Sequence, residues 1–514
     1  MGDPRWVRLQ TRATLSKSTD ILPALERFGS AGPFNTQVAN LIMVRCVFQR
    51  PVYLARTVRP SLLRSAASAF DDKFRCTLAT LNDDITPAAL TVDTSSVSLQ
   101  AELPVVMGGL QWRRLTRLLD PAYLGGFTAA ARVAHSMQSS PGVVALPDLA
   151  SVPFSQDLGA LEVRGRLLDQ LSVVRLDSAL ATTVRRTFGD PTVDQLLDPA
   201  AQIDGHIAAE LADQVPPQRR TQRCLTAALE VIARARLSMQ LHEHTPAAVS
   251  HMDAASTRGA YEFLTVIPWT SELSLANHDM VTAIKRRLRL NVLPDSLRGS
   301  RCNLGCQAVV SLDGAHTFSC KRGGGTQWRH DSIANTLIQC SKSAGVSARP
   351  ATVADEDRPG HSQSKPDVVL AGIHSQQPDN VDVSFVHAEN TDVLAAVQAR
   401  VRTKMRDHRQ AAFRVGHTFT PFVLNGLGGL ERDHALALIK SLAQRAAVHN
   451  VDEWVSRQFT PHWLARFSVT TQRLAANSLR RSMSAPSQYV GGIGGDAAAA
   501  DGGFAAFVRA AGVV

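Results

Sequence analysis

The chain has 514 residues, of which 44% are hydrophobic and 19% are charged, a composition typical of folded proteins that excludes wholesale disorder. Its length exceeds one ordinary hydrophobic core and predicts two or three domains. The net charge of +10 favours a polyanionic partner, although charge alone does not separate nucleic acid from a membrane surface.

Cysteine usage indicates a reducing compartment. Seven cysteines are too few and too unevenly placed for a disulfide scaffold. No apolar signal peptide follows Met1, and the chain has no long uncharged apolar run, so we expect no membrane partner.

The N-terminal half is predicted to be mainly helical. Residues 35–81 carry apolar side chains at helical spacing, with breaks expected at Pro51 and Pro60. A turn is expected around Gly108, and residues 219–240 form the clearest long helix.

An aspartate pair within the first helical region resembles the carboxylates of polymerase palms. Asp71 and Asp72, in the sequence AFDDKF, lie in a pattern of helical period, whereas the palm motif requires a β-hairpin. We therefore predict no catalytic role for this pair.

The pattern changes near residue 301 and predicts a small α/β domain. Helices are expected at 331–344, 393–414, 433–446 and 461–481, and short strands at 367–372, 380–386 and 419–426. The last residues, from about 483 to 514, are rich in glycine and alanine and are predicted to be disordered or peripheral.

Three cysteines and one histidine occur in one short window, as CNLGC followed by GAHTFSC. Three thiolates and one imidazole in closely spaced pairs are typical of a tetrahedral structural Zn²⁺ site, and the candidate ligands are Cys302, Cys306, His316 and Cys320. The alternative is a chance grouping of buried thiols.

Positive charge is concentrated between residues 285 and 330, a pattern suited to contact with phosphates. The candidate nucleic-acid contacts in this segment are Lys285, Arg286, Arg287, Arg289, Lys321, Arg322, Arg329 and His330. Arg329 and His330 are expected at the start of a helix, where they face either a phosphate or solvent. The run KRRLR fits a phosphate-contacting segment as well as a nuclear import signal.

Two aspartates precede or begin predicted strands. Asp367 and Asp382 would lie at the same end of one sheet if their strands are adjacent, and such a pair can hold Mg²⁺ or Mn²⁺, which activates water against a phosphodiester. Aspartates are also common in turns beside strands, so a purely structural role is the alternative.

The following helix supplies cations at matching spacing. Arg400, Lys404 and His408 occur at i, i+4 and i+8 and therefore share one face. Lys404 and His408 are candidate catalytic residues and Arg400 a candidate nucleic-acid contact, because a cation reaching the carboxylates can stabilise negative charge on a phosphate. A solvated basic helix face is the alternative.

Several motifs occur in a defined order: CNLGC, HTFSC, WRHD, SKPDVVL, VDVSFV, and then a lysine and a histidine on one helix. In this order they resemble the C-terminal part of the open reading frame of site-specific non-LTR retrotransposons. That part is a CCHC zinc knuckle followed by a restriction-like endonuclease of the PD-(D/E)xK type. Upstream, NTQVANLIMVRCVFQRPVYLARTV, LPVVMGGLQWRRL and EFLTVIPW resemble the thumb and linker that follow a reverse-transcriptase palm.

The resemblance implies a reaction. In that family the endonuclease nicks double-stranded target DNA, and the freed 3′ hydroxyl primes reverse transcription of the element's RNA. The family's catalytic aspartates fall on Asp367 and Asp382, and its lysine, displaced from the strand to the next helix, falls on Lys404. His408 replaces the tyrosine usually found one turn further on.

Two departures from the family pattern stand out. The family often carries an acid-Pro ahead of the Pro-Asp, where this chain has Arg349, and the polymerase palm is absent, so the chain is not expected to synthesise DNA. A polymerase-bearing copy of the same element is a possible partner, beside target DNA and element RNA, and the substrate implies a nuclear location.

Together these observations predict a mixed fold with a thumb-like helical region at 1–120, a helical linker at 121–300, a CCHC knuckle at 301–322 and an endonuclease domain at 323–482. The predicted function is Mg²⁺-dependent nicking of DNA. Two alternatives are a catalytically inactive nucleic-acid-binding remnant of such an element and a cellular resolvase-type nuclease.

Overall fold

A computed structural model describes residues 3–82, 85, 90, 95–138, 158–211, 220–244, 246–302, 306, 308–320, 322, 325–357, 365–371, 373, 377–387, 392–449 and 453–483. The structure is 72% helical with one small mixed sheet, which confirms the expectation of a mixed fold dominated by helices. None of the described helices is long and apolar enough to cross a membrane.

The chain divides into two compact units. The helical unit comprises Met1–Phe28, Ala39–Pro104 and Leu110–Thr245, and the mixed α/β unit comprises Gly29–Val38, Val105–Gly109 and Pro246–Val514. The boundary expected at residue 120 falls within a helix of the helical unit, and the knuckle and endonuclease segments belong to one unit.

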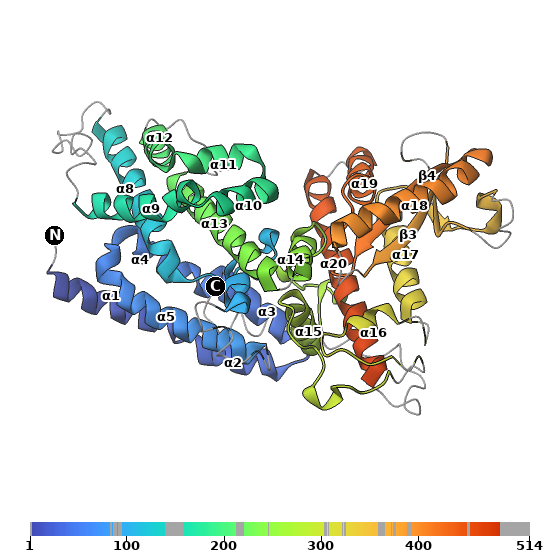
Figure 1. The fold of residues 1–514 in the computed structure, drawn as a ribbon, viewed down its shortest axis with the longest axis horizontal. Helices are drawn as coiled ribbons and strands as arrows, with labels where there is room; N and C mark the ends of the chain where they lie inside the picture. Colours follow the sequence, from blue (N-terminus) through green and yellow to red (C-terminus); the bar gives the residue numbers. More distant parts are fainter. Residues whose placement is uncertain are drawn as a thin grey trace. The chain divides into compact units, whose positions relative to one another are not determined.

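Helices build the described part of the helical unit (Figure 1). They are α1 (Pro4–Thr19), α4 (Gln49–Thr57), α5 (Pro60–Leu81), α7 (Ser96–Glu102), α8 (Leu115–Gln138), α9 (Leu158–Leu176), α10 (Ser178–Phe188), α11 (Asp190–Leu197), α12 (Pro199–Leu211) and α13 (Thr221–His244). The helices α2 (Leu22–Ala31) and α3 (Asn35–Ile42) contribute residues to both units.

Helix α8 is the centre of the helical unit and packs against α4, α5 and α13. Two glycines permit this close packing. A Cβ atom on Gly126 would lie 2.3 Å from the carbonyl oxygen of Arg56 in α4, and one on Gly125 would lie 2.5 Å from Cβ of Gln222 in α13. Larger residues at either position would separate the helices.

The two prolines of the first helical region behave differently. Pro60 begins α5 at the first helical position, as expected, because its missing N–H needs no partner there. The break expected at Pro51 is wrong. A single turn of π-helix at Met43–Val47 leads into α4, and Pro51 lies in the first turn of α4, where backbone N–H groups have no intrahelical acceptor.

The mixed unit contains helices around a four-stranded sheet. Its helices are α14 (Pro246–Ser256), α15 (Asn277–Arg287), α16 (Ala315–Ser319), α17 (Gly325–Ser343), α18 (Val393–Arg414), α19 (Ala435–His449) and α20 (Glu453–Met483). Its strands are β1 (Ser347–Pro350), β2 (Val368–Ala371), β3 (Asp379–Val386) and β4 (Thr418–Asn425).

The sheet has the order β1-β2-β3-β4. Strands β1, β2 and β3 pair antiparallel, and β4 pairs parallel with β3 through the crossover helix α18. Alternate residues of a strand face opposite sides, so Val381 and Val383 join the larger core while Asp382 between them faces the other side.

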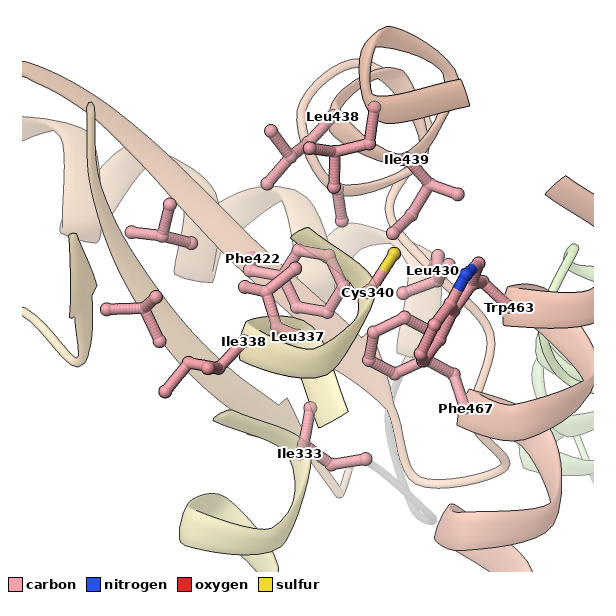
Figure 2. Close-up of a cluster of buried hydrophobic side chains, with 14 of the residues drawn as sticks. Ile333, Leu337, Ile338, Cys340, Phe422, Leu430, Leu438, Ile439, Trp463 and Phe467 are labelled. Carbon is pink, nitrogen blue, oxygen red and sulfur yellow. The ribbon is translucent and has the colours of Figure 1, made fainter. Parts of the chain in front are cut away.

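The larger core lies between the sheet and helices α17, α19 and α20. Figure 2 shows Leu337 of α17 beside Phe422 of β4, with Trp463 and Phe467 of α20 closing the cluster. On the opposite face, α18 packs Val397 and Val401 against Val423 of β4. Helices thus cover both faces of the sheet, and Asp382 of β3 is a polar residue on the face that α18 covers.

Most elements of this unit agree with the predicted ones. Helix α18 begins and ends where predicted, and β2, β3 and β4 lie within two residues of the expected ranges. Strand β1 was not predicted, and α17 begins at Gly325, six residues earlier than expected. The glycine-rich residues after 483 lie outside the described part of the chain.

Candidate functional site

The four candidate zinc ligands converge in the mixed unit. His316 lies in α16, and Cys320 directly follows that helix. The Sγ atom of Cys320 lies 4.0 Å from that of Cys302 and 3.8 Å from that of Cys306, whose Sγ atom lies 3.1 Å from Nε2 of His316. All four ligand atoms lie within 4.8 Å of one another.

This cluster can bind a metal such as zinc. Zinc–thiolate bonds of about 2.3 Å in a tetrahedron place neighbouring sulfurs about 3.8 Å apart, which matches the observed separations. A hydrogen bond from the backbone of Ala308 lowers the pKa of Cys306, which favours the thiolate needed for coordination. Four protein ligands fill the coordination sphere, so the ion would support the fold and would not activate water.

Arg287 was expected to contact nucleic acid, and this is wrong because its side chain is only 1% exposed. Its guanidinium donates hydrogen bonds to the carbonyl oxygens of Gly109, Ala260 and Val105 at 2.9, 3.2 and 2.6 Å. Burial lowers its pKa to about 9. Arg287 therefore satisfies main-chain acceptors inside the mixed unit.

Arg286 was also expected at the surface, and it too is buried. Its guanidinium donates to the carbonyl oxygen of Gly426 at 2.8 Å and lies 4.0 Å from the ring centroid of Phe318. The cation–π contact joins α15 to the Cys/His segment, and the hydrogen bond joins α15 to the residue that follows β4. A phosphate has no access to this group.

The expectation that Arg329 contacts nucleic acid is also wrong, because the residue is buried. Its position is in the second turn of α17, where it is 4% exposed, and its guanidinium donates to the carbonyl oxygen of Phe318. Burial lowers its pKa to about 10. Among the other candidate contacts, Lys285 is half-buried, Arg289, Arg322 and Arg400 are exposed, and Lys321 lies outside the described residues.

Asp367 lies immediately before β2, where the chain fixes it from several sides. Its carbonyl oxygen accepts from the backbone N–H of Ala351 at 3.0 Å, and its N–H donates to the carbonyl oxygen of Val381 at 2.9 Å. Its carboxylate accepts from the backbone N–H of Val383 at 2.7 Å. The side chain is therefore held across the neighbouring strand β3.

Asp382 projects from β3 toward α18. Its carboxylate lies 2.6 Å from Nζ of Lys404 and 3.2 Å from Nε2 of His408. Lys404 and His408 are one turn apart on α18, so the predicted stripe does reach the sheet. The lysine is thus near the carboxylates although it belongs to the helix and not to the strand.

The two aspartates and His330 form one cluster. One ligand atom of each residue lies within 4.8 Å of the others, and Nε2 of His330 is 2.9 Å from the carboxylate of Asp367. Carboxylates this close can share a divalent cation, with His330 as a further ligand or as a hydrogen-bond donor. The spatial requirement for a shared metal site is met.

The pKa values of the two carboxyl groups in this cluster shift in opposite directions. Burial raises the pKa of Asp382, and the neighbouring Asp367 charge adds to this while Lys404 opposes it. Burial also acts on Asp367, but the hydrogen bond and charge of His330 outweigh it and lower the pKa of Asp367. The Asp367 hydrogen bond raises the pKa of His330 to about 9. A cation between the carboxylates would favour the charged form of both.

A buried glutamate, which the sequence did not single out, supports this site. Glu356 accepts from Nδ1 of His408 at 2.9 Å, and its side chain is 1% exposed. The His408 ring also stacks on Phe419, with centroids 5.4 Å apart. Both ring nitrogens of His408 are therefore occupied by carboxylates, so it positions Asp382 and does not face a substrate.

Arg349 has a structural partner. Its guanidinium forms a bidentate pair with Asp355 at 2.5 and 2.7 Å, and this hydrogen bonding holds the pKa of Asp355 well below its usual range. The pair fixes the turn that leads to Glu356. The arginine that departs from the family pattern thus helps to place an acid beside the site.

Neither a protein-family model nor a curated protein matches the chain. The assignment of this site therefore depends on its own residues and geometry.

Proposed function

We propose that the mixed unit is a Mg²⁺- or Mn²⁺-dependent DNA endonuclease whose active site is formed by Asp367, Asp382 and Lys404. The observation that carries the proposal is the convergence of the two carboxylates within 4.8 Å, with the lysine Nζ 2.6 Å from Asp382. Paired carboxylates on adjacent strands with a lysine beside them suit phosphodiester hydrolysis better than any neutral substrate.

Each residue has a defined task in this proposal. Asp367 and Asp382 provide the hard oxygen ligands that Mg²⁺ prefers, and the ion when bound would polarise a phosphate and lower the pKa of a water molecule. Lys404 places a positive charge where a non-bridging phosphate oxygen would gain negative charge. His330 donates to Asp367 and so orients that ligand.

Exposed cations near the site would hold the DNA backbone. Arg400 lies one turn before Lys404 on α18 and is exposed, with no acidic partner in the described part of the chain. A guanidinium here can contact a phosphate flanking the cut bond.

We propose further that the chain is the C-terminal part of a non-LTR retrotransposon protein, with target DNA and element RNA as partners and a nuclear location.

Nicking of supercoiled plasmid DNA in Mg²⁺ or Mn²⁺ tests this function. The Asp367→Ala and Lys404→Ala variants are expected to lose activity by about 100-fold or more, as is typical when a group that stabilises developing charge is removed. The matched controls are Asp433→Ala and Lys440→Ala, which change exposed residues near or on α19. Equal cleavage by all variants would refute the site, and DNA binding without cleavage by the unaltered chain would favour the inactive remnant.

A further inference from the structure

A groove in the helical unit carries unopposed positive charge. It lies between α1 and α5, has a volume of about 730 Å³ and is far in sequence from the endonuclease residues. Its cations are Arg8, Arg12 and Lys73, all exposed, and no carboxylate lines it. None of the three has an acidic partner in the described part of the chain.

Helical periodicity arranges the groove. On α1, Arg8, Arg12 and Ser16 are four residues apart and share one face. The α5 helix has the same four-residue spacing at Ser61, Ser65, Ala69 and Lys73. The small side chains of the α5 stripe leave a hollow beside α1, and the cations of both helices line it.

The hydroxyl groups suit the same ligand as the cations. Ser16, Ser61 and Ser65 are exposed in the groove and can donate to an anionic oxygen. Ala69 completes the α5 stripe without filling the space. A groove of donors without acceptor carboxylates selects for an anion.

A second cavity in the same unit contains arginines that are paired with carboxylates of the chain. It is lined by Arg113, Arg114 and Arg117, but these face Glu230 and Glu102 at 2.6 to 2.8 Å. Those charges are compensated within the chain. The groove between α1 and α5 differs because its cations have no such partners.

We propose that the groove between α1 and α5 binds the sugar-phosphate backbone of a nucleic acid. The α5 segment from Ser61 to Lys73 spans about 18 Å, which corresponds to about five steps of a B-form strand. Cations distributed over that length and over two helices fit an extended polyanion and not a compact one. This site is independent of the proposed endonuclease function.

The test is the affinity of the full chain for fluorescein-labelled 20-nucleotide probes, as single-stranded DNA, single-stranded RNA and duplex DNA. Fluorescence anisotropy is measured without Mg²⁺ at several salt concentrations. The groove variant carries Arg8→Gln, Arg12→Gln and Lys73→Gln. The control variant carries Arg5→Gln, Lys17→Gln and Arg50→Gln, which remove the same charge from exposed positions of α1 and α4 outside the groove.

The groove variant is expected to bind at least one probe about tenfold more weakly and to lose about 2 to 3 from the slope of log affinity against log salt, while the control variant changes little. The preferred probe identifies the strand type. Equal losses in both variants, no loss in either, or competition by nucleoside triphosphate as strong as by the oligonucleotide would overturn the proposal.

Two further measurements keep the outcome interpretable. Lys73→Glu leaves α1 unaltered and is expected to weaken binding severalfold, with an unchanged circular dichroism spectrum. The Asp433→Ala chain, changed at an exposed position outside both sites, is expected to bind the probes as the unaltered chain does. Because anisotropy is measured without Mg²⁺, a failed nicking assay does not bear on the groove. Binding that is unchanged in both Lys73→Glu and the groove variant would contradict this site.

Discussion

The guanidinium of Arg329 donates a hydrogen bond to the carbonyl oxygen of Phe318, which lies between the candidate metal ligands His316 and Cys320. The next residue of α17, His330, contacts Asp367 at 2.9 Å. Adjacent residues of one helix thus touch the Cys/His cluster and the carboxylate cluster. A structural change at the Cys/His cluster can therefore affect the carboxylate cluster through Arg329 and His330 of α17.

Zinc removal is expected to loosen the first two turns of α17. Without the ion, the segment around Phe318 loses the cross-link that holds its carbonyl oxygen in place, and Arg329 loses a fixed acceptor. Hydrogen exchange before and after chelation should show faster exchange at residues 325–332. The amides of α18 serve as the control, and unchanged exchange at 325–332 would contradict this coupling.

Loss of Glu356 is expected to destabilise the mixed unit by about 1 to 3 kcal/mol, as when a buried hydrogen-bonding group loses its partner. The Glu356→Ala variant leaves His408 without its Nδ1 acceptor in a buried position. Urea unfolding monitored by circular dichroism measures the effect. Asp357→Ala changes the exposed neighbour and should have little effect; equal costs would show that the pair is not important.

Asp71 is expected to have a structural role in place of a catalytic one. Its carboxyl group accepts from the backbone N–H of Leu115 and of Thr116, at 2.6 and 3.0 Å, at the start of α8. Asp71→Ala leaves these donors without acceptors and should cost about 1 to 3 kcal/mol in the free energy of unfolding at pH 5. Asp72→Ala, at the exposed neighbouring position, should cost much less.

The same residue predicts a pH dependence. Burial raises the pKa of Asp71 from 3.8 to about 6, against the hydrogen bonds from Thr116 and Leu115. A carboxyl group whose pKa is higher in the folded chain contributes stability that is fully present below about pH 4 and is lost as the pH rises through 6. This difference corresponds to roughly 3 kcal/mol.

The Asp71→Asn variant isolates that contribution because an amide does not titrate in this range. The free energy of unfolding of the unaltered chain, relative to that of Asp71→Asn, should fall by up to roughly 3 kcal/mol between pH 4 and pH 7. Urea titrations at each pH provide the values. A difference independent of pH would show that Asp71 keeps an ordinary pKa.

Local pattern predicted the elements that carry the site. Helix α18 has a continuous helical repeat and an Asp392 cap, and the apolar runs of β3 and β4 read as strands. Strand β1 was not predicted because its four residues, SARP, include an arginine and a proline and are typical of a loop. Proline is tolerated there because the strand lies at the edge of the sheet.

The sequence-based predictions failed mainly on charged side chains that the structure buries. A run of arginines suggested a surface for phosphates. However, Met280, Ala283 and Arg287 occur at i, i+3 and i+7 on one helix face, and that apolar face was the available signal. No comparable signal existed for Glu356. It lies in a polar loop, and its burial depends on packing against α18, which is about fifty residues away in the sequence.

The most direct test of the proposed active site is Mn²⁺ binding followed by electron paramagnetic resonance, together with nicking at the same Mn²⁺ concentrations. The unaltered chain should reach half-maximal occupancy and half-maximal nicking rate at similar Mn²⁺ concentrations. Asp382→Asn should lose both, while Asp433→Asn retains them. Unchanged nicking in Asp382→Asn, or Mn²⁺ binding that neither Asp367→Asn nor Asp382→Asn weakens, would contradict the proposed site.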